Sequence, residues 1–210
     1  MAVAEKLERA NAAVLPVWPL CMKSRMTVEK ETVMRECVLF IAMSLDGYIA
    51  DKEGGVGWLE GQGQDEENQD VYSEFIKEVD TVLMGYTTYQ QVVTELSPTQ
   101  WVYEGMKTYV FTHRKIPSQE NIIFTKEAPG DLVERLKKKP GRKIWVCGGA
   151  ELVRQLIEKD CIDMYYLSVI PTILGGGVRL FPSLKEEKKL RLADMKTYNG
   201  ITDLIYRPRG

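Results

Sequence analysis

The sequence predicts an α/β fold built on a largely parallel sheet, and three features of the chain lead to this prediction. Short apolar runs rich in β-branched and aromatic residues alternate with segments whose apolar residues recur at helical spacing. Within residues 143–181, the strand pattern 144–147 is followed by Gly148-Gly149, a helix pattern and a second strand pattern, which predicts a βαβ unit. Near the C-terminus, two strand patterns flank Asn199-Gly200 and predict an antiparallel hairpin.

The individual elements follow from local patterns, taken in chain order. Uninterrupted apolar runs indicate buried strands, since a strand covered on both faces loses the alternation of polar and apolar residues. A helix over 64–79 would place Val71 and Phe75 on one face. The helix capped by Asp131 should end at Pro140-Gly141, because neither residue continues a helix well. The expected strands are 38–43, 81–84, 108–112, 122–125, 144–147, 164–170, 190–198 and 201–206, and the expected helices are 64–79, 87–95, 131–139 and 150–157.

Composition and charge narrow the functional class. A chain of 210 residues with 44% hydrophobic and 28% charged residues can bury a sizeable core and is typical of globular proteins. Its formal net charge of −2 gives no general attraction to nucleic acid or to an anionic membrane surface. We therefore expect a small-molecule substrate, and neither nucleic acid nor a membrane as a partner.

The cysteine and histidine content argues against a metal centre. The four cysteines show no C-x-x-C spacing, and two of them lie in apolar segments, where small buried side chains are expected. The chain has one histidine, His113, so a histidine-based zinc site is not expected and we predict no metal. The cysteine pattern favours the reducing environment of the cytoplasm.

Residues 1–33 differ in character from the rest of the chain. Pro16 and Pro19 interrupt their apolar run, which is too short to span a bilayer. No pattern of a cleaved targeting segment is present there. We expect a compact domain over 34–210, preceded by a disordered N-terminal extension or the product of an upstream start.

Gly148-Gly149 is the first candidate for a binding site. Paired glycines let a diphosphate approach the main chain closely, and the helix that follows directs free N–H groups toward such an anion. The alternative is a tight turn between a strand and a helix, which requires no ligand. The glycine pair alone therefore does not assign a function.

Six short motifs follow one another along the chain: IAMSLDGYIA (41–50), Trp58, VLMGYTTY (82–89), VFTHR (110–114), VCGGAEL (146–152) and PTILGGG (171–177). In this order they resemble the dihydrofolate reductase superfamily, and the closest branch contains the reductase domain of bacterial riboflavin biosynthesis and its stand-alone relatives. The resemblance covers about residues 34–210. It implies a three-layer dihydrofolate reductase-like fold with a mostly parallel central sheet and an antiparallel C-terminal hairpin. We also expect a homodimer.

The resemblance implies NADPH as the cofactor. Relatives hold its diphosphate at the equivalent glycine pair, typically joined by a cis peptide, and its 2′-phosphate where Thr112-His113-Arg114 stands. A hydroxyl, an imidazole and a guanidinium suit a dianionic phosphate. Relatives often carry a basic residue at the position of Tyr86, and this departure weakens phosphate binding there. The residues expected to bind NADPH are Ala42, Ile49, Gly85, Tyr86, Thr87, Thr88, Thr112, His113, Arg114, Cys147, Gly148, Gly149, Ala150, Glu151 and Leu152.

The substrate side is predicted from two carboxylates and two neighbours. Asp70 is the candidate for gripping the amino group of a pterin-like ring, and the alternative is a solvated helix carboxylate. Asp46 could orient substrate hydroxyls or relay a proton, and the alternative is a turn-forming aspartate before glycine. Trp58 and Ser168 are expected to contact the substrate. The stretch 100–107 contains no arginine for the glutamate tail of folate, which argues against dihydrofolate.

The predicted function is that of an NADPH-dependent reductase that transfers a hydride to a phosphoribosylamino-pyrimidine, as in riboflavin biosynthesis. One alternative is a dihydrofolate or pterin reductase. The other is a non-catalytic NADP-binding module that keeps the fold without the chemistry.

Overall fold

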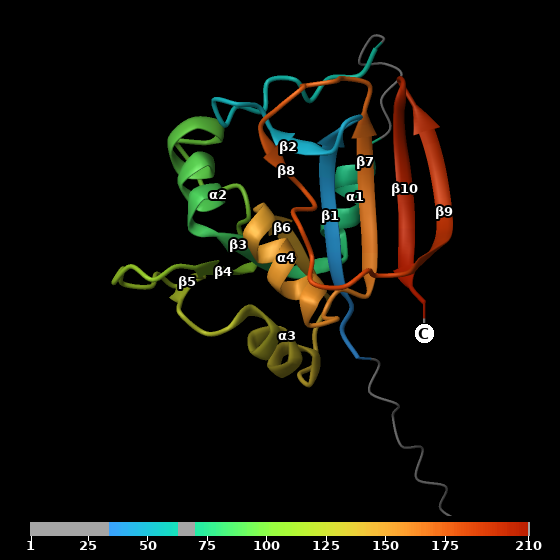
Figure 1. The fold of residues 1–210 in the computed structure, drawn as a ribbon. Helices are drawn as coiled ribbons and strands as arrows, with labels where there is room; N and C mark the ends of the chain where they lie inside the picture. Colours follow the sequence, from blue (N-terminus) through green and yellow to red (C-terminus); the bar gives the residue numbers. More distant parts are fainter. Residues whose placement is uncertain (1–33, 63–69, 210) are drawn as a thin grey trace, which may run out of the picture. The chain divides into compact units, whose positions relative to one another are not determined.

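The computed structural model describes residues 34–62 and 70–209, and their main feature is an eight-stranded sheet with the strand order β5-β4-β3-β6-β1-β7-β10-β9 (Figure 1). The pairs from β5 to β7 are parallel, whereas β10 runs antiparallel to both β7 and β9. The strands are β1 (Cys37–Ser44), β2 (Tyr48–Ala50), β3 (Val79–Gly85), β4 (Lys107–Phe111), β5 (Ile122–Thr125), β6 (Lys143–Gly148), β7 (Met164–Ile170), β8 (Val178–Arg179), β9 (Leu190–Tyr198) and β10 (Ile201–Pro208). The helices are α1 (Val71–Lys77), α2 (Tyr86–Gln91), its π-helical continuation η2 (Val92–Leu96), α3 (Pro129–Lys137) and α4 (Ala150–Glu158).

This arrangement confirms the predicted fold class, a mostly parallel sheet with an antiparallel C-terminal hairpin. The short pair β2–β8 was not predicted, because strands of two or three residues are too short to carry a recognisable alternation. The helix predicted over 64–79 is α1, which ends at Lys77, and Val79 already belongs to β3. The first part of that predicted helix lies outside the described residues, as does the extension predicted over 1–33.

The start of α3 corrects the prediction that Asp131 caps this helix. The N-cap is Ala128, and Asp131 lies in the first turn. Pro129 opens the helix, because its fixed backbone angle suits the first helical turn and its missing N–H would have no helical partner there. The carboxylate of Asp131 still complements the positive end of the helix dipole.

Two apolar layers cover the two faces of the sheet, and successive strand residues contribute to opposite layers. In β1, Leu39 belongs to the layer packed under α3 and α4, whereas Val38 belongs to the layer packed under α1. Phe75 is the buried anchor of α1, and its ring stacks on Phe40 with the centroids 4.2 Å apart. Helices on both faces of one sheet give the predicted three layers.

The central pair of strands separates before its end. β1 pairs with β6 only as far as Leu39 and Val146, whereas its pairing with β7 continues to Ser44 and Ile170. The part of β1 beyond Leu39 therefore leaves β6, and the sheet opens at the carboxyl ends of its parallel strands.

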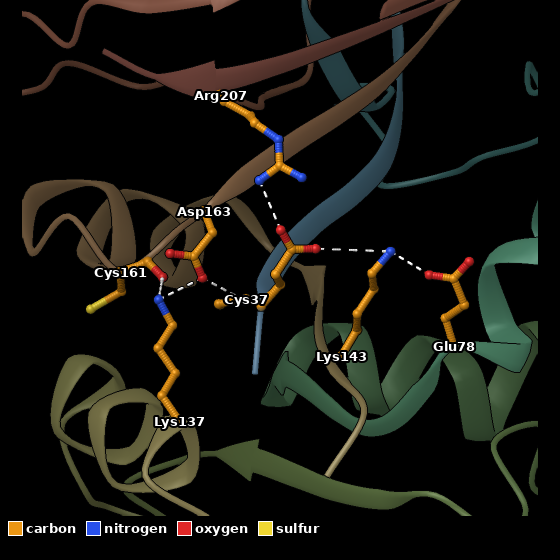
Figure 2. A network of polar contacts seen from close by, with 8 residues as sticks. Cys37, Glu78, Lys137, Lys143, Cys161, Asp163 and Arg207 are labelled. Atoms are coloured by element: carbon orange, nitrogen blue, oxygen red, sulfur yellow. Dashed lines mark hydrogen bonds and ion pairs between the residues drawn. The ribbon is translucent and has the colours of Figure 1, made fainter. Parts of the chain in front are cut away.

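Ion pairs tie the opposite end of the sheet together (Figure 2). Lys143, at the start of β6, pairs with Glu78 immediately before β3 and reaches Glu36 immediately before β1. Arg207, near the end of β10, donates to Glu36 at 2.8 Å. These contacts join the starts of β1, β3 and β6 to the end of the antiparallel β10, so they hold the sheet far from the edge that opens.

A second polar contact fixes α3 and β7 to β1. The Asp163 carboxylate accepts a hydrogen bond from the Cys37 main-chain N–H at 2.7 Å and pairs with the Lys137 ammonium at 2.6 Å. Lys137 also donates to the main-chain oxygen of Cys161. The Lys137 side chain is only 14% exposed, so these partners supply the polar contacts that it would otherwise make with water.

In the part of the chain that the structure describes, no helix is long and apolar enough to cross a membrane.

Replacing Asp163 by alanine should lower the free energy of unfolding by about 2 kcal/mol, since a half-buried ammonium loses its carboxylate and the Cys37 N–H loses its acceptor. Chemical denaturation measures the change. The control is Glu74→Ala, which removes an exposed carboxylate paired with Lys77 and should cost about 0.5 kcal/mol or less. Equal losses for the two variants would contradict the role given to Asp163.

Candidate active-site cleft

A cleft of about 1010 Å³ lies at the carboxyl ends of the parallel strands and includes the gap where β1 leaves β6. Ile41 and Ala42 line it from β1, and Cys147 and Gly148 line it from β6. Clefts of this size at the carboxyl edge of a parallel sheet are the usual binding sites of α/β proteins. The remaining lining residues are Ile49, Ala50, Gly54, Val56, Leu59, Gly85, Tyr86, Thr87, Thr88, Gln91, Val92, Leu96, Tyr103, Phe111, Thr112, His113, Thr125, Lys126, Glu127, Ala128, Pro129, Gly149, Ala150, Glu151, Leu152, Gln155 and Val178.

The predicted cofactor residues therefore come together, although they are distributed over much of the chain. All of them except Arg114 line this one cleft. Their roles toward a ligand remain predictions, since what the structure establishes is their common location.

The glycine pair forms a shallow cradle at the junction of β6 and α4. The Gly148–Gly149 peptide is cis, as the resemblance implies. Gly149 is the N-cap of α4 and makes no side-chain cap, so the first N–H groups of the helix face the cleft without a capping side chain. A methyl group added at Gly149 would lie 3.4 Å from Thr88 Oγ1, and one at Gly85 would lie 3.8 Å from the Gly149 nitrogen. Gly148 and Gly149 thus leave main chain exposed beside the Thr88 hydroxyl, and Gly85 leaves it exposed beside the Gly149 nitrogen.

Arg114, shortly after the end of β4, does not line the cleft itself but contacts a residue that does. Its guanidinium lies 4.5 Å over the centre of the Tyr86 ring, which does line the cleft. The Arg114 N–H donates to Thr112 Oγ1 at 3.1 Å, which fixes the turn after the strand. Lys126, immediately after β5, is a cleft residue that the sequence analysis missed, because a lone lysine after a strand carries no signal.

Glu151 lies in the first turn of α4, and its negative charge is paired with an arginine of the same helix. Its carboxylate accepts two hydrogen bonds from the Arg154 guanidinium, at 2.6 and 2.8 Å, and one from Gln155. The contact with Arg154 lowers the pKa of Glu151 to about 2, and that with Gln155 contributes. A carboxylate already paired in this way adds little net negative charge to the cradle.

The other half of the cleft is apolar and aromatic. Its lining residues are Val56, Leu59, Val92, Leu96 and Tyr103. The Tyr103 hydroxyl lies 3.5 Å from Cys147 Sγ, and burial raises the pKa values of both groups. Neither group is therefore suited to losing a proton near neutral pH.

Asp46 fastens the triple-glycine segment to β1. Its carboxylate accepts hydrogen bonds from Ser44 Oγ at 2.7 Å, from the Leu174 N–H at 3.1 Å and from the Gly175 N–H at 2.8 Å. The Ser44 contact is the main reason why the Asp46 pKa falls to about 2. A group with this pKa stays ionised near neutral pH and is poorly suited to supply a proton, so the geometry favours the turn-forming alternative.

Two other predicted substrate residues do not line the cleft. Asp70 is the exposed N-cap of α1, where it accepts from the Ser73 N–H at 3.1 Å, in agreement with the alternative of a solvated helix carboxylate. Trp58 is half-buried and donates to the Gly55 main-chain oxygen, while its neighbours Val56 and Leu59 reach the cleft.

The fourth predicted substrate residue, Ser168, lies in β7 and donates to Asp203 at 2.6 Å. Asp203 was missed by the sequence analysis. The available signal was a carboxylate in the middle of an apolar strand pattern, since such a residue is almost never fully buried unless it has partners.

The residues present fit NADPH better than a metal. No group of three or more histidine, cysteine, aspartate or glutamate side chains within residues 34–62 and 70–209 could hold a metal ion. The glycine cradle offers main chain rather than side chain at its surface, which suits a diphosphate.

The ionisation of Asp46 can be measured directly. We expect its carboxyl carbon to titrate by NMR with a pKa near 2, below the ordinary value of 3.8. Because the folded-state pKa is lowered, the stabilisation is complete above pH 3.8 and is lost as the pH falls through about 2. In Ser44→Ala the Asp46 pKa should rise, since the main donor is gone. A parent pKa at the ordinary value would show that these hydrogen bonds do not form in solution.

Several known proteins are similar to this chain in sequence or in fold. The chain is 40% identical over 178 residues to the uncharacterized protein YwjB of Bacillus subtilis (strain 168), covering 82% of this chain and 97% of that protein. A putative riboflavin biosynthesis protein from Shewanella sp. PV-4 superposes with a TM-score of 0.73 at 25% identity, covering 83% of this chain and 99% of that one. Dihydrofolate reductase from Enterococcus faecalis, solved with NADP(H), shares the fold with a TM-score of 0.57 at 17% identity, covering 83% and 97%.

The model of one protein family matches residues 35–206, which span almost all of the described sheet and every element that lines the cleft. The chain therefore belongs to the RibD C-terminal domain family.

Proposed function

We propose that the protein is an NADPH-dependent reductase that acts on a pyrimidine-type heterocycle. The observation that carries this proposal is the continuity of one cleft, from the glycine cradle at α4 through the gap between β1 and β6 to an apolar aromatic half. One end suits a diphosphate, the gap suits a nicotinamide ring, and the far half suits a planar substrate.

NADPH, when bound, supplies the hydride. Gly85, Gly148 and Gly149 would let its diphosphate approach the main chain, and the first N–H groups of α4 would donate to it. Ala42 and Ile49 form small apolar walls of the gap, which would keep water away from the ring and hold it in position.

Arg114 supports the choice of NADPH over NADH. Its guanidinium rests on the Tyr86 ring, so a positive charge is held beside the position where relatives carry a basic residue. Thr112, His113 and Lys126 line the same part of the cleft. Together these groups would surround a 2′-phosphate with donors and positive charge.

The substrate half favours a ring over a charged group. Among the described residues that line the cleft, the basic ones are His113 and Lys126, and both lie at the end proposed for the adenosine phosphate. The finer prediction of a phosphoribosylamino-pyrimidine stays a prediction, and its phosphate would need partners beyond these walls. The pterin alternative loses support because Asp70 lies on the surface.

The proton required by the reduction comes, in this proposal, from solvent. Glu127 and Glu151 are the carboxylates among the described lining residues, and both lie near the cofactor end. Asp46, held ionised by its donors, would serve to position the triple-glycine segment rather than to transfer the proton.

A homodimer in the cytoplasm completes the proposal. Leu192 and Met195 are exposed apolar side chains on β9, the edge strand of the sheet, which supports pairing of two chains there. The cytoplasmic location rests on the cysteine pattern of the sequence. Light scattering coupled to size exclusion measures the oligomeric state, and a monomeric mass would contradict the dimer.

The assay that tests the function follows the loss of NADPH absorbance with a panel of phosphoribosylamino-pyrimidines, pterins including dihydrofolate, and simple carbonyl compounds. Turnover of a pyrimidine in preference to the others is the expected result. Tight NADPH binding without any turnover would instead favour the non-catalytic NADP-binding module, and failure to bind NADPH would overturn both.

Gly149→Ala should weaken NADPH binding by about tenfold or more while leaving the fold intact, since its methyl would occupy the cradle. Gly149 has φ of −89°, which alanine accepts, whereas Gly148 has φ of +133° and does not tolerate a side chain without strain. Glu151→Ala, at the same helix end, is the control and should alter stability more than affinity. Titration with NADPH and thermal melts of each variant decide the matter. If Gly149→Ala binds NADPH as tightly as the parent does, the glycine pair is only a turn and the diphosphate assignment is wrong.

Arg114→Ala should remove most of the preference for NADPH over NADH. Losing one charge-assisted contact costs about 1.5–3 kcal/mol, which corresponds to roughly tenfold or more in the ratio of the two dissociation constants. Lys115→Ala is the matched control, because it removes an adjacent exposed cation. Equal affinities of the parent for NADPH and NADH would refute the assignment.

A further inference from the structure

Asp203 is a buried carboxylate that has no role in the reaction proposed above. It lies in β10 with 0% of its surface exposed, and it accepts hydrogen bonds from three hydroxyl groups. Oδ1 accepts from Ser168 at 2.6 Å and from Tyr198 at 3.4 Å, and Oδ2 accepts from Tyr166 at 2.7 Å. A buried carboxylate costs stability unless it is well paired, so this arrangement calls for a reason beyond packing.

The strand register connects Asp203 to the cleft. Ala42 in β1 lies opposite Ser168 in β7, and Ser168 lies opposite Asp203 in β10. Residues opposite each other on neighbouring strands project from the same face of a sheet. Ser168 is half-buried and is not itself a lining residue of the cleft, but it stands on the strand next to Ala42, which lines the gap proposed for the nicotinamide.

This row lies on the face of the sheet that carries the apolar aromatic layer. Tyr166, two residues before Ser168 and therefore on the same face, has its ring centroid 4.8 Å from that of Phe40. This is the same layer that contains Tyr103, a wall of the substrate half of the cleft. A ring bound beside Ala42 on this face would meet the Ser168 hydroxyl at its edge.

The chemistry of the hydroxyl decides what it can recognise. A serine hydroxyl has one proton to donate and two lone pairs to accept with, whereas a carboxylate only accepts. Because Ser168 donates its proton to Asp203 and also forms a hydrogen bond with the Tyr198 hydroxyl, what it can offer a ligand is a remaining lone pair. The Ser168 oxygen would accept a hydrogen bond from a ring N–H group. It would repel a carbonyl oxygen, because that atom also has only lone pairs to offer.

We infer that Asp203 is a positioning residue that fixes Ser168 as a hydrogen-bond acceptor, so that the site selects a planar heterocycle with an amino or ring N–H group at this edge. The inference rests on the proposed function and narrows its substrate class. It assigns to β7 and β10 the ring-gripping role that Asp70, on the surface, is not placed to perform.

The test compares two ligands that share one ring system and carry either amino or methyl groups at the same two positions, at a pH high enough to keep both uncharged. Binding of 2,4-diaminoquinazoline and of 2,4-dimethylquinazoline to the NADPH-saturated full chain is measured by calorimetry. The parent should prefer the diamino compound by about tenfold, the equivalent of one hydrogen bond of ordinary strength. In Asp203→Asn the amide N–H₂ would donate a hydrogen bond to the Ser168 hydroxyl, whose own proton would then point toward the ligand. The preference for the diamino compound should therefore disappear, while the dimethyl compound should bind as before.

Asp194→Asn is the matched control, because Asp194 is an exposed carboxylate on the neighbouring strand β9, and it should keep the preference. NADPH affinity is measured first for every variant. If Asp203→Asn fails to fold, Ser168→Ala replaces it and should lose the preference equally. Retention of the preference in a folded Asp203→Asn or Ser168→Ala variant would overturn the inference, as would a parent that binds neither compound or both equally. A parent that fails to bind NADPH at all would sink the proposed function instead, and the comparison of the two ligands would then be made on the chain alone.

Discussion

The early end of the pairing between β1 and β6 is the constraint on which the rest of the site depends. Beyond Leu39 and Val146 the two strands no longer share main-chain hydrogen bonds, while β1 stays paired to β7 through Ser44. The opposite end of the sheet is held together by polar contacts. The contacts of Asp163, Lys143 and Arg207 hold that end, where the parallel strands start and β10 ends.

The opening explains why one cleft has two different halves. On one side of the gap stand the ends of β3, β4 and β6 with the starts of α2 and α4, which offer main-chain N–H groups, hydroxyls and cations. On the other side lies the layer under α1, which offers aromatic rings and few charges. A cofactor rich in phosphate and a planar substrate have these opposite requirements, and the gap is where their reacting atoms would meet.

Polar groups near the gap are mostly committed to other protein groups. Asp46 holds the triple-glycine segment, Glu151 is paired with Arg154, and Asp203 gathers three hydroxyls. The carboxylates near the site therefore act through the groups they orient. This is consistent with a reductase in which position and exclusion of water matter more than acid catalysis by a side chain.

The sequence by itself determined the fold class, the order of the strands along the chain and the residues that come together at the end of the cleft that we propose for the cofactor. Strand and helix periods are local, and motifs such as Gly148-Gly149 or Thr112-His113-Arg114 place several groups within a few residues of one another. The helix start at Pro129 and the pair β2–β8 were misjudged or missed, because caps and very short strands leave weak local signals.

The part of the site that we propose for the substrate was decided only by the tertiary structure. Ala42, Ser168 and Asp203 meet because three strands far apart in the sequence pair in one register, and no local pattern encodes that register. Asp70 caps a helix in solvent, whereas Asp203 is enclosed by hydroxyls. What a carboxylate does depends on its burial and its partners, and long-range strand pairing sets both.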